Sequence, residues 1–169
     1  MDSSQIATLS LFLTLGPLVL ASYGLLYKGA AAGRDFWFGM PKQVQYVYYV
    51  FMLLAAVGLC TFTGTYCARP RPTTGLFRFG WVVPVLFATL LLASAGWSVA
   101  VALTTQRWLV SLLLVVVAVC SILLVAGTAE ADNSTWYMVL GAVLFAVCTV
   151  LNDGVGWNAN YLLKTMPPA

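Results

Sequence analysis

The stretch Trp108-Leu-Val-Ser-Leu-Leu-Leu-Val-Val-Val-Ala-Val119 decides the fold class of this chain, because it is apolar on every side. A strand of a membrane barrel alternates apolar and polar residues over about ten positions, and this stretch does not alternate. It belongs to an uncharged run, 108–129, that is long enough to cross roughly 30 Å of hydrocarbon as a helix. The stretch therefore predicts a transmembrane helix.

The composition of the whole chain agrees with this helix. Of 169 residues, 62% are hydrophobic and only 8% are charged. A soluble domain carries about 25% charged residues, because its outside must be covered by groups that water solvates. The composition therefore excludes an ordinary soluble protein and indicates a lipid bilayer as the surrounding medium. The net charge of +3 is too small and too dispersed to indicate binding of nucleic acid.

Four further uncharged runs resemble the first in length and composition: 3–27, 43–68, 79–106 and 133–152. We therefore predict an all-α fold, an integral membrane bundle of five transmembrane helices in one domain over residues 1–169. The spans are expected at about 6–27, 44–66, 80–103, 108–128 and 136–157. The first run is expected to stay in the membrane as a span, since Met1-Asp-Ser-Ser4 lacks the basic residues of a secretory signal.

The basic residues predict how the bundle is oriented. With five spans, the first and third connections lie on the same side as the C-terminus. That side holds Lys28, Arg34, Lys42, Arg107 and Lys164, and the other side holds Arg69, Arg71 and Arg78. Positive residues concentrate on the cytoplasmic side, so we expect a cytoplasmic C-terminus. The organelle stays open between the mitochondrial outer membrane, the endoplasmic reticulum and the plasma membrane. Glycosylation at the sequon of Asn133, on the predicted outer side, also stays open.

The residue types that enzymes use are scarce in this sequence. There is no histidine, so the usual general base, haem ligand and zinc ligand are missing. No Gly-rich nucleotide motif or nucleophile motif is present. We therefore expect no catalytic activity and no cofactor. The cysteines, which form no Cys-x-x-Cys pair, are interpreted as thiols buried among apolar residues: Cys60, Cys67, Cys120 and Cys148.

Asp153 and Asn152 are the polar residues that the predicted fifth span carries near its end. An ionised group at the centre of the bilayer costs at least about 2.5 kcal/mol, which makes Asp153 a candidate functional residue. The alternative is that Asp153 lies at the hydrated interface and ends the helix together with Gly154 and Gly156. Asn152 is expected to be buried, where its amide needs a hydrogen-bonding partner or a ligand.

Trp97 is the tryptophan that does not lie near a predicted span end. The other five sit at or near these ends, as expected for an aromatic belt at the membrane interface: Trp37, Trp81, Trp108, Trp136 and Trp157. Trp97 is flanked by small residues in 93–100, which let helices approach closely. Its ring either fills a gap in the packing or forms the wall of a pocket.

Taken in order along the chain, these features resemble the translocator protein family, also called tryptophan-rich sensory proteins, which are five-helix membrane proteins of similar length. The matching segments are Leu11-Phe-Leu-Thr-Leu-Gly-Pro17, Gly24-Leu-Leu-Tyr-Lys28, Phe36-Trp37, Pro41-Lys42, Trp97, Arg107-Trp108-Leu-Val-Ser-Leu-Leu-Leu114, and Ala146-Val-Cys-Thr-Val-Leu-Asn152 followed by Trp157 and Asn160. The family's Trp-Asn-Pro-Pro after the first loop is missing here. Around Ser94, Ser98 and Ser111 the chain also departs from the family's pocket residues, which leaves the ligand undetermined.

The resemblance implies that a hydrophobic ligand, a sterol or a tetrapyrrole, binds inside the bundle, with transport as an extension of binding. Trp37 would then lie on a lid formed by the first loop, and Trp97, Cys148 and Asn152 would face the cavity. We add Asp153 to this candidate site. Tyr161 is included because 155–164 fits the loose pattern proposed for cholesterol contact. The expected partners are the bilayer, this ligand, and either a second copy of the chain or other subunits.

A second interpretation makes the chain a structural accessory subunit of a larger membrane complex. Small multi-span chains without chemical machinery suit that role. A channel is disfavoured, because too few polar residues are available to line a pore. An internal cavity near Trp97 would favour ligand binding, whereas a solidly packed bundle with a broad groove would favour the subunit.

The five-span topology makes a prediction about labelling in intact membranes. Single cysteines introduced at Ala31 and Lys164 should react with an impermeant maleimide from one side, and a cysteine at Thr74 from the other. This follows because an odd number of spans separates Thr74 from the other two positions. Labelling of positions 31 and 74 from the same side would contradict the five-span count.

Overall fold

The computed structural model describes residues 1–31, 40–103 and 107–159, and every regular element in this part of the chain is a helix. The elements are α1 (Ser3–Ala31), α2 (Lys42–Ala68), η1 (Leu76–Arg78, a 3₁₀ helix), α3 (Val82–Leu103), α4 (Arg107–Glu130), α5 (Trp136–Thr149) and η2 (Val150–Trp157, a π-helix). Five stretches within them are long and apolar enough to cross a membrane. The predicted all-α bundle of five long helices is therefore confirmed, with boundaries that differ by a few residues.

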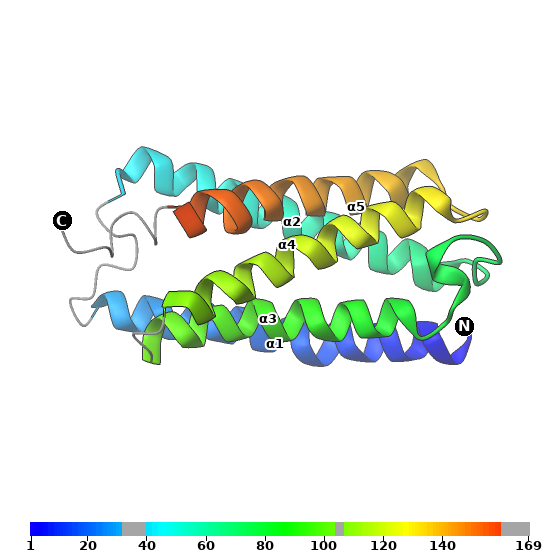
Figure 1. Cartoon of the computed structure of the whole chain (residues 1–169), viewed down its shortest axis with the longest axis horizontal. Helices are drawn as coiled ribbons and strands as arrows, with labels where there is room; N and C mark the ends of the chain where they lie inside the picture. Colours follow the sequence, from blue (N-terminus) through cyan, green and yellow to red (C-terminus); the bar gives the residue numbers. More distant parts are fainter. Residues whose placement is uncertain (32–39, 104–106, 160–169) are drawn as a thin grey trace.

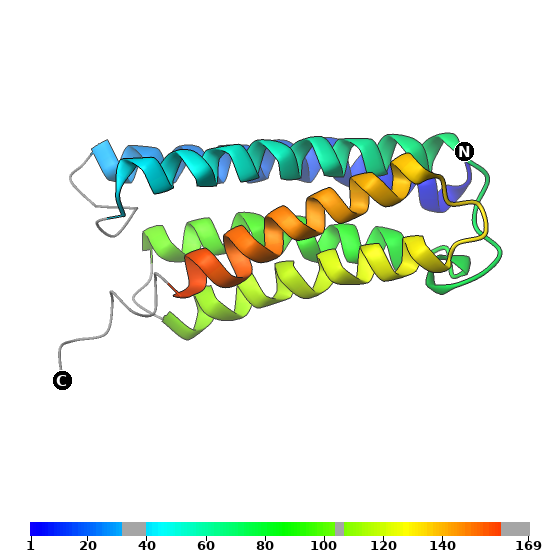
Figure 2. The same cartoon turned by 90° about the horizontal axis from the view of Figure 1, so that it is seen from above.

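The long helices form a ring whose order differs from their order in the sequence (Figures 1 and 2). Around the ring, α1 packs against α3, α3 against α4, α4 against α5 and α5 against α2. The helices α3 and α4 follow each other closely in the sequence and are antiparallel neighbours. The ring closes between α1 and α2, and theirs is the least extensive of these contacts. The seam between α1 and α2 is therefore its most open side.

The closest approach of two helices is the crossing of α2 and α5 at a pair of glycines. A Cβ atom on Gly58 would lie 2.6 Å from the backbone nitrogen of Phe145, and one on Gly141 would lie 2.8 Å from that of Phe62. These distances are shorter than atoms tolerate, so both positions need glycine. Close contact of backbones through small residues is a main source of association between helices in lipid. The two glycines therefore fix α2 against α5.

An aromatic cluster fills one end of the bundle, where α2 ends and α3 begins. Phe62 and Tyr66 of α2 are stacked, with ring centroids 6.0 Å apart. Phe77 of η1 meets the edge of Phe62 at 6.2 Å, and Phe87 of α3 lies 5.9 Å from Phe62 on another side. Phe77 is fully buried and its ring occupies the space above Gly127 of α4. The loop between α2 and α3 is thus anchored in the core.

Gln5 ties the start of α1 to the end of α2 at this same end. Its backbone N–H donates to the Asp2 carboxylate at 2.9 Å, and its side-chain oxygen accepts from the Asp2 N–H at 2.9 Å. This reciprocal pair is a capping box, which satisfies donors at the start of a helix. The Gln5 amide nitrogen also donates to the carbonyl of Tyr66 at 2.9 Å and to that of Arg69. The seam between α1 and α2 is therefore pinned at this end.

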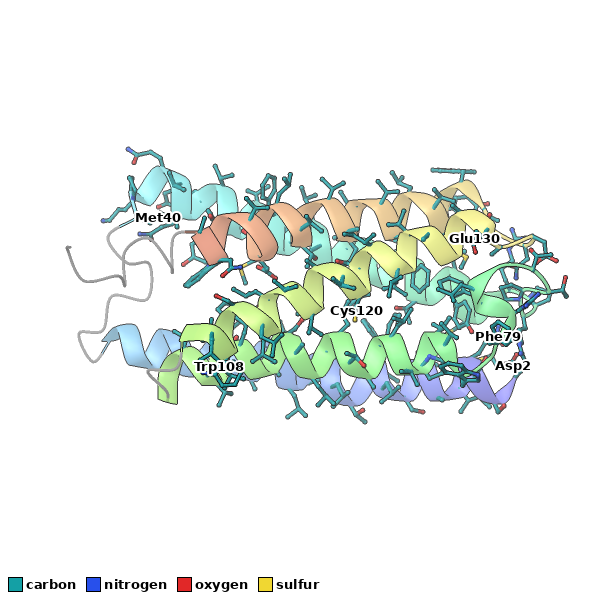
Figure 3. All side chains as sticks on the ribbon, viewed as in Figure 1. Asp2, Met40, Phe79, Trp108, Cys120 and Glu130 are labelled. Carbon is teal, nitrogen blue, oxygen red and sulfur yellow. The ribbon has the colours of Figure 1, made fainter. Side chains whose placement is uncertain are left out.

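The two connections at this end bind each other through Asp132. Its carboxylate accepts from the Thr73 backbone N–H at 3.0 Å and from the Thr73 hydroxyl. These hydrogen bonds hold the pKa of Asp132 below its usual value of 3.8, so their contribution is present above that pH and is lost as the pH falls below it. The Asn133 amide nitrogen, which a glycan would occupy, donates to the Pro70 carbonyl. Figure 3 shows Asp2, Phe79 and Glu130 at this end and Met40 at the opposite end.

Polar hydroxyl groups inside the helices bond to the backbone of their own helix. Each donates to a carbonyl three or four residues earlier, which satisfies the hydroxyl without water. The hydroxyls that do so are Thr8, Thr14, Ser22, Thr61, Thr63, Thr65, Ser98, Ser121 and Thr128. These residues therefore do not require a polar pore or a ligand.

The interfacial tryptophans follow the predicted belt at three positions but not at Trp157. Trp81, Trp108 and Trp136 project outward, and each is about two-thirds exposed. Trp157 is only 1% exposed and packs in the interior. The wider turn of η2 explains this correction, because a π-helix adds a residue per turn and rotates the following side chains relative to an α-helix. Trp37 lies outside the described residues.

The glycine crossing predicts a specific loss of stability. Gly141→Ala should lower the free energy of unfolding by roughly 1–3 kcal/mol, because its Cβ must push α2 and α5 apart. Thermal unfolding in detergent measures this as a lower Tm. Gly64→Ala is the matched control, since a Cβ at Gly64 meets nothing within 4 Å. Equal Tm values for the two variants would contradict a tight crossing.

Candidate functional site

A cavity of about 590 Å³ lies inside the ring, lined by α1, α2, α3, the end of α5 and the start of η2. Its lining is mainly apolar, with side chains such as Phe12, Met52, Leu59, Leu90 and Phe145. Leu59, Leu90 and Phe145 also belong to the hydrophobic core that contains the aromatic cluster. The volume falls within the range of about 300–1,000 Å³ that small-molecule sites occupy.

The cavity opens sideways through the seam between α1 and α2. Leu13 and Leu20 of α1 line it and are also 62% and 71% exposed on the outer surface. Leu53 of α2 lines it from the other side of the seam and is 66% exposed. Gly16, between the two leucines of α1, also lines the cavity, and a Cβ there would meet nothing within 4 Å. Because these helices are apolar along their length, the opening faces the hydrocarbon of the bilayer.

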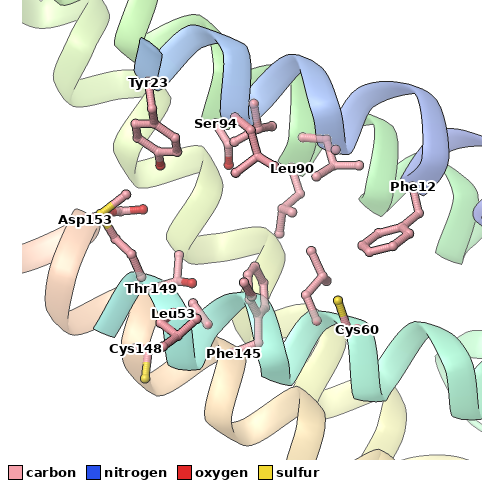
Figure 4. Close-up of a pocket in the computed structure, with 18 of the residues that line it drawn as sticks. Phe12, Tyr23, Leu53, Cys60, Leu90, Ser94, Phe145, Cys148, Thr149 and Asp153 are labelled. Carbon is pink, nitrogen blue, oxygen red and sulfur yellow. The ribbon is translucent and has the colours of Figure 1, made fainter. Parts of the chain in front are cut away.

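Polar side chains gather at the end of the cavity away from the aromatic cluster. Figure 4 shows Tyr23 of α1 and Asp153 of η2 at this end, and Phe12 and Cys60 at the other. The remaining polar lining residues of this end come from α3, α5 and η2: Ser94, Thr149 and Asn152. An apolar wall with a few convergent polar groups at one end is the usual composition of a small-molecule site.

The π-helix η2 carries both polar residues of the fifth span into the cavity wall. Asn152 and Asp153 are adjacent in the sequence, yet both are buried, at 4% and 8% exposure. The Asn152 amide nitrogen donates to the Asp153 carboxylate at 2.8 Å, whereas the buried amide oxygen of Asn152 has no hydrogen-bonding partner. π-Helical turns inside α-helices are frequent at functional sites. The sequence left the place of Asp153 open, and the structure buries it.

A pair of buried tryptophans packs next to the polar end of the cavity. The Trp97 ring meets the Tyr23 ring edge-on, with centroids 5.8 Å apart, and lies 5.2 Å from the Trp157 ring. Both tryptophans are 1% exposed and belong to a second core cluster that includes Met40. This cluster separates the polar end from the loop side of the bundle. Aromatic clusters therefore lie at both ends of the cavity, and the seam lies at its side.

The candidate residues fall into three groups. Cys148, Asn152 and Asp153 line the cavity. Trp97 does not line it, but lies inside the bundle and packs against Tyr23. Trp37 and Tyr161 lie outside the described residues. Whether any of them binds a ligand stays a prediction.

Three polar lining residues were missed by the sequence reasoning. Tyr23 lies in the first span, and its phenol in an apolar run was the signal that could have identified it. Ser94 was noted as a small residue and as a departure from the family's pocket residues, but not as a site residue of this chain. Thr149 was noted only as part of a motif. No periodic pattern in the sequence identifies such residues. The spans are apolar on every face, so the sequence carries little information about which face points inward.

Neither a metal site nor a match to a known protein indicates a function for the cavity. Within the described residues, no three His, Cys, Asp or Glu side chains are grouped so that they could hold a metal ion. Comparisons with protein-family models, with curated proteins and with solved structures give no match to the chain.

Proposed function

We propose that this chain binds a hydrophobic small molecule of the sterol or tetrapyrrole type within the cavity, as its resemblance to the translocator protein family implies. The observation that carries the proposal is the cavity of about 590 Å³, apolar along its length and polar at one end. Such a space suits a molecule with a large apolar body and one polar end. The ligand reaches the cavity from the hydrocarbon phase through the seam between α1 and α2.

The alternative role, an accessory subunit without a ligand, is less well supported by the cavity. A subunit whose only role is structural is stabilised by a filled interior, because the side chains around an empty space lose van der Waals contacts. Here the two clusters on either side are well packed, with Phe62, Phe77 and Phe87 in one and Trp97 and Trp157 in the other. A cavity between two well-packed clusters therefore favours the ligand-binding role over the purely structural role.

The proposal predicts that filling the seam blocks binding. The purified chain should quench tryptophan emission by energy transfer to dehydroergosterol, a fluorescent sterol, in a saturable manner. Gly16→Phe should weaken this binding by about tenfold or more, equivalent to about 1.4 kcal/mol, because the new ring occupies the opening. The ring should be accommodated without unfolding, since a Cβ at Gly16 meets nothing within 4 Å.

Gly64→Phe is the matched control for this experiment. Gly64 lies on the exposed outside of α2, is not part of the cavity lining, and also has open space at its Cβ position. Its variant should bind the sterol as the parent does. Both variants should keep the Tm of the parent. Unchanged binding in Gly16→Phe, or an equal loss in both variants, would reject the cavity as the site.

A further inference from the structure

The hydrogen-bonding groups at the polar end of the cavity determine which chemical head a ligand can carry there. A carboxylate can only accept hydrogen bonds, so the Asn152 amide must present its NH₂ group to Asp153, as it does at 2.8 Å. With its NH₂ group bonded to Asp153, the Asn152 amide has only its oxygen left without a hydrogen-bonding partner, and that oxygen is buried. A buried acceptor without a donor costs free energy. The pair therefore presents two acceptors, the Asp153 carboxylate and the Asn152 amide oxygen, and the Asn152 oxygen has no donor bonded to it.

The second feature of this end is the buried carboxyl group of Asp153. Asp153 is buried, and no lysine or arginine pairs with it among the residues that the structure describes. The titratable groups near it are the phenols of Tyr23 and Tyr48, which supply no positive charge. A buried carboxylate is stable when a cation pairs with it and hydrogen bonds satisfy it. A molecule in the cavity can supply such a cation and so stabilise the ionised form of Asp153.

We propose that the site selects ligands whose apolar body ends in a protonated amine, which donates to the amide oxygen of Asn152 and pairs with Asp153. This inference rests on the proposed function, and it names the head group of the ligand. A hydroxyl head supplies a donor but no charge, and is bound less tightly. A sulfate or carboxylate head brings a like charge against Asp153 and further acceptors, and is excluded. Tetrapyrroles with acidic side chains therefore fit this end less well than sterols or amines.

Competition between matched sterols tests the proposal. The parent chain is loaded with dehydroergosterol in neutral phosphatidylcholine nanodiscs and titrated with three competitors. These are cholesterol, its analogue with an amino group in place of the hydroxyl, and cholesterol sulfate. The amine should displace the probe at a concentration at least about tenfold lower than cholesterol, and the sulfate should be the weakest of the three. Equal competition by the amine and the sulfate would overturn the proposal.

Variants at the polar pair separate charge from orientation. Asp153→Asn keeps the shape of the side chain and removes its charge, so the preference for the amine over cholesterol should fall to less than about threefold. Asn152→Leu should retain binding of the probe and, because Asp153 is still present, keep the sulfate as the weakest of the three competitors. Asp132→Asn, which alters an acid in the connections outside the spans, is the control and should leave the order of the competitors unchanged. A preference for the amine that survives Asp153→Asn would overturn the assignment.

The two proposals fail in different ways. If dehydroergosterol binds to the parent chain and Gly16→Phe prevents this binding, the result supports the cavity as the site, whatever head group the site prefers. With that result in hand, indifference to the head group overturns only the inference about the amine. If neither dehydroergosterol nor the amine analogue binds saturably to the parent chain, both proposals are rejected.

Discussion

The crossing of α2 and α5 at Gly58 and Gly141 is the contact on which the rest of the ring depends. In hydrocarbon the hydrophobic effect does not drive helices together, so the geometry of a bundle follows from where backbones approach most closely. The contact of α2 with α5 is much more extensive than its contact with α1. Gln5 pins α1 to α2 at one end only, and beyond that point the two helices separate. The open seam therefore lies on the other side of α2 from its tight contact with α5.

The two aromatic clusters determine the extent of the cavity behind this opening. At one end Phe77, supplied by η1 in a loop, is inserted between helices and fills the core. At the other end Trp97 and Trp157 support Tyr23 and close the interior from the loop side. Between the two clusters lies an interior space whose opening, among the described residues, is the seam between two apolar helices. A molecule that partitions into lipid is therefore suited to reach it, and polar solutes are not.

The sequence predicted the number, type and approximate bounds of the long helices, because charge and length decide these in a membrane. It did not predict the order of the helices around the ring. Gly58 and Gly141 are 83 positions apart and carry no mark of their pairing. It identified Asn152 and Asp153 as candidates from the cost of burying polar groups, but it could not decide between interface and interior for Asp153. That choice depends on the extra residue per turn in η2, which composition does not reveal. The same turn moved Trp157 from the expected belt into the core.

Photolabelling tests most directly our proposal that a lipid-soluble molecule occupies the interior of the ring. The chain in native membranes is exposed to a photoreactive sterol, illuminated and mapped by mass spectrometry. The account predicts adducts on residues that can be reached only from within the cavity, such as the buried Ser94 and Thr149, and on the seam residues beside them. Adducts confined to outward-facing residues such as Leu112 and Val119 of α4 would contradict it.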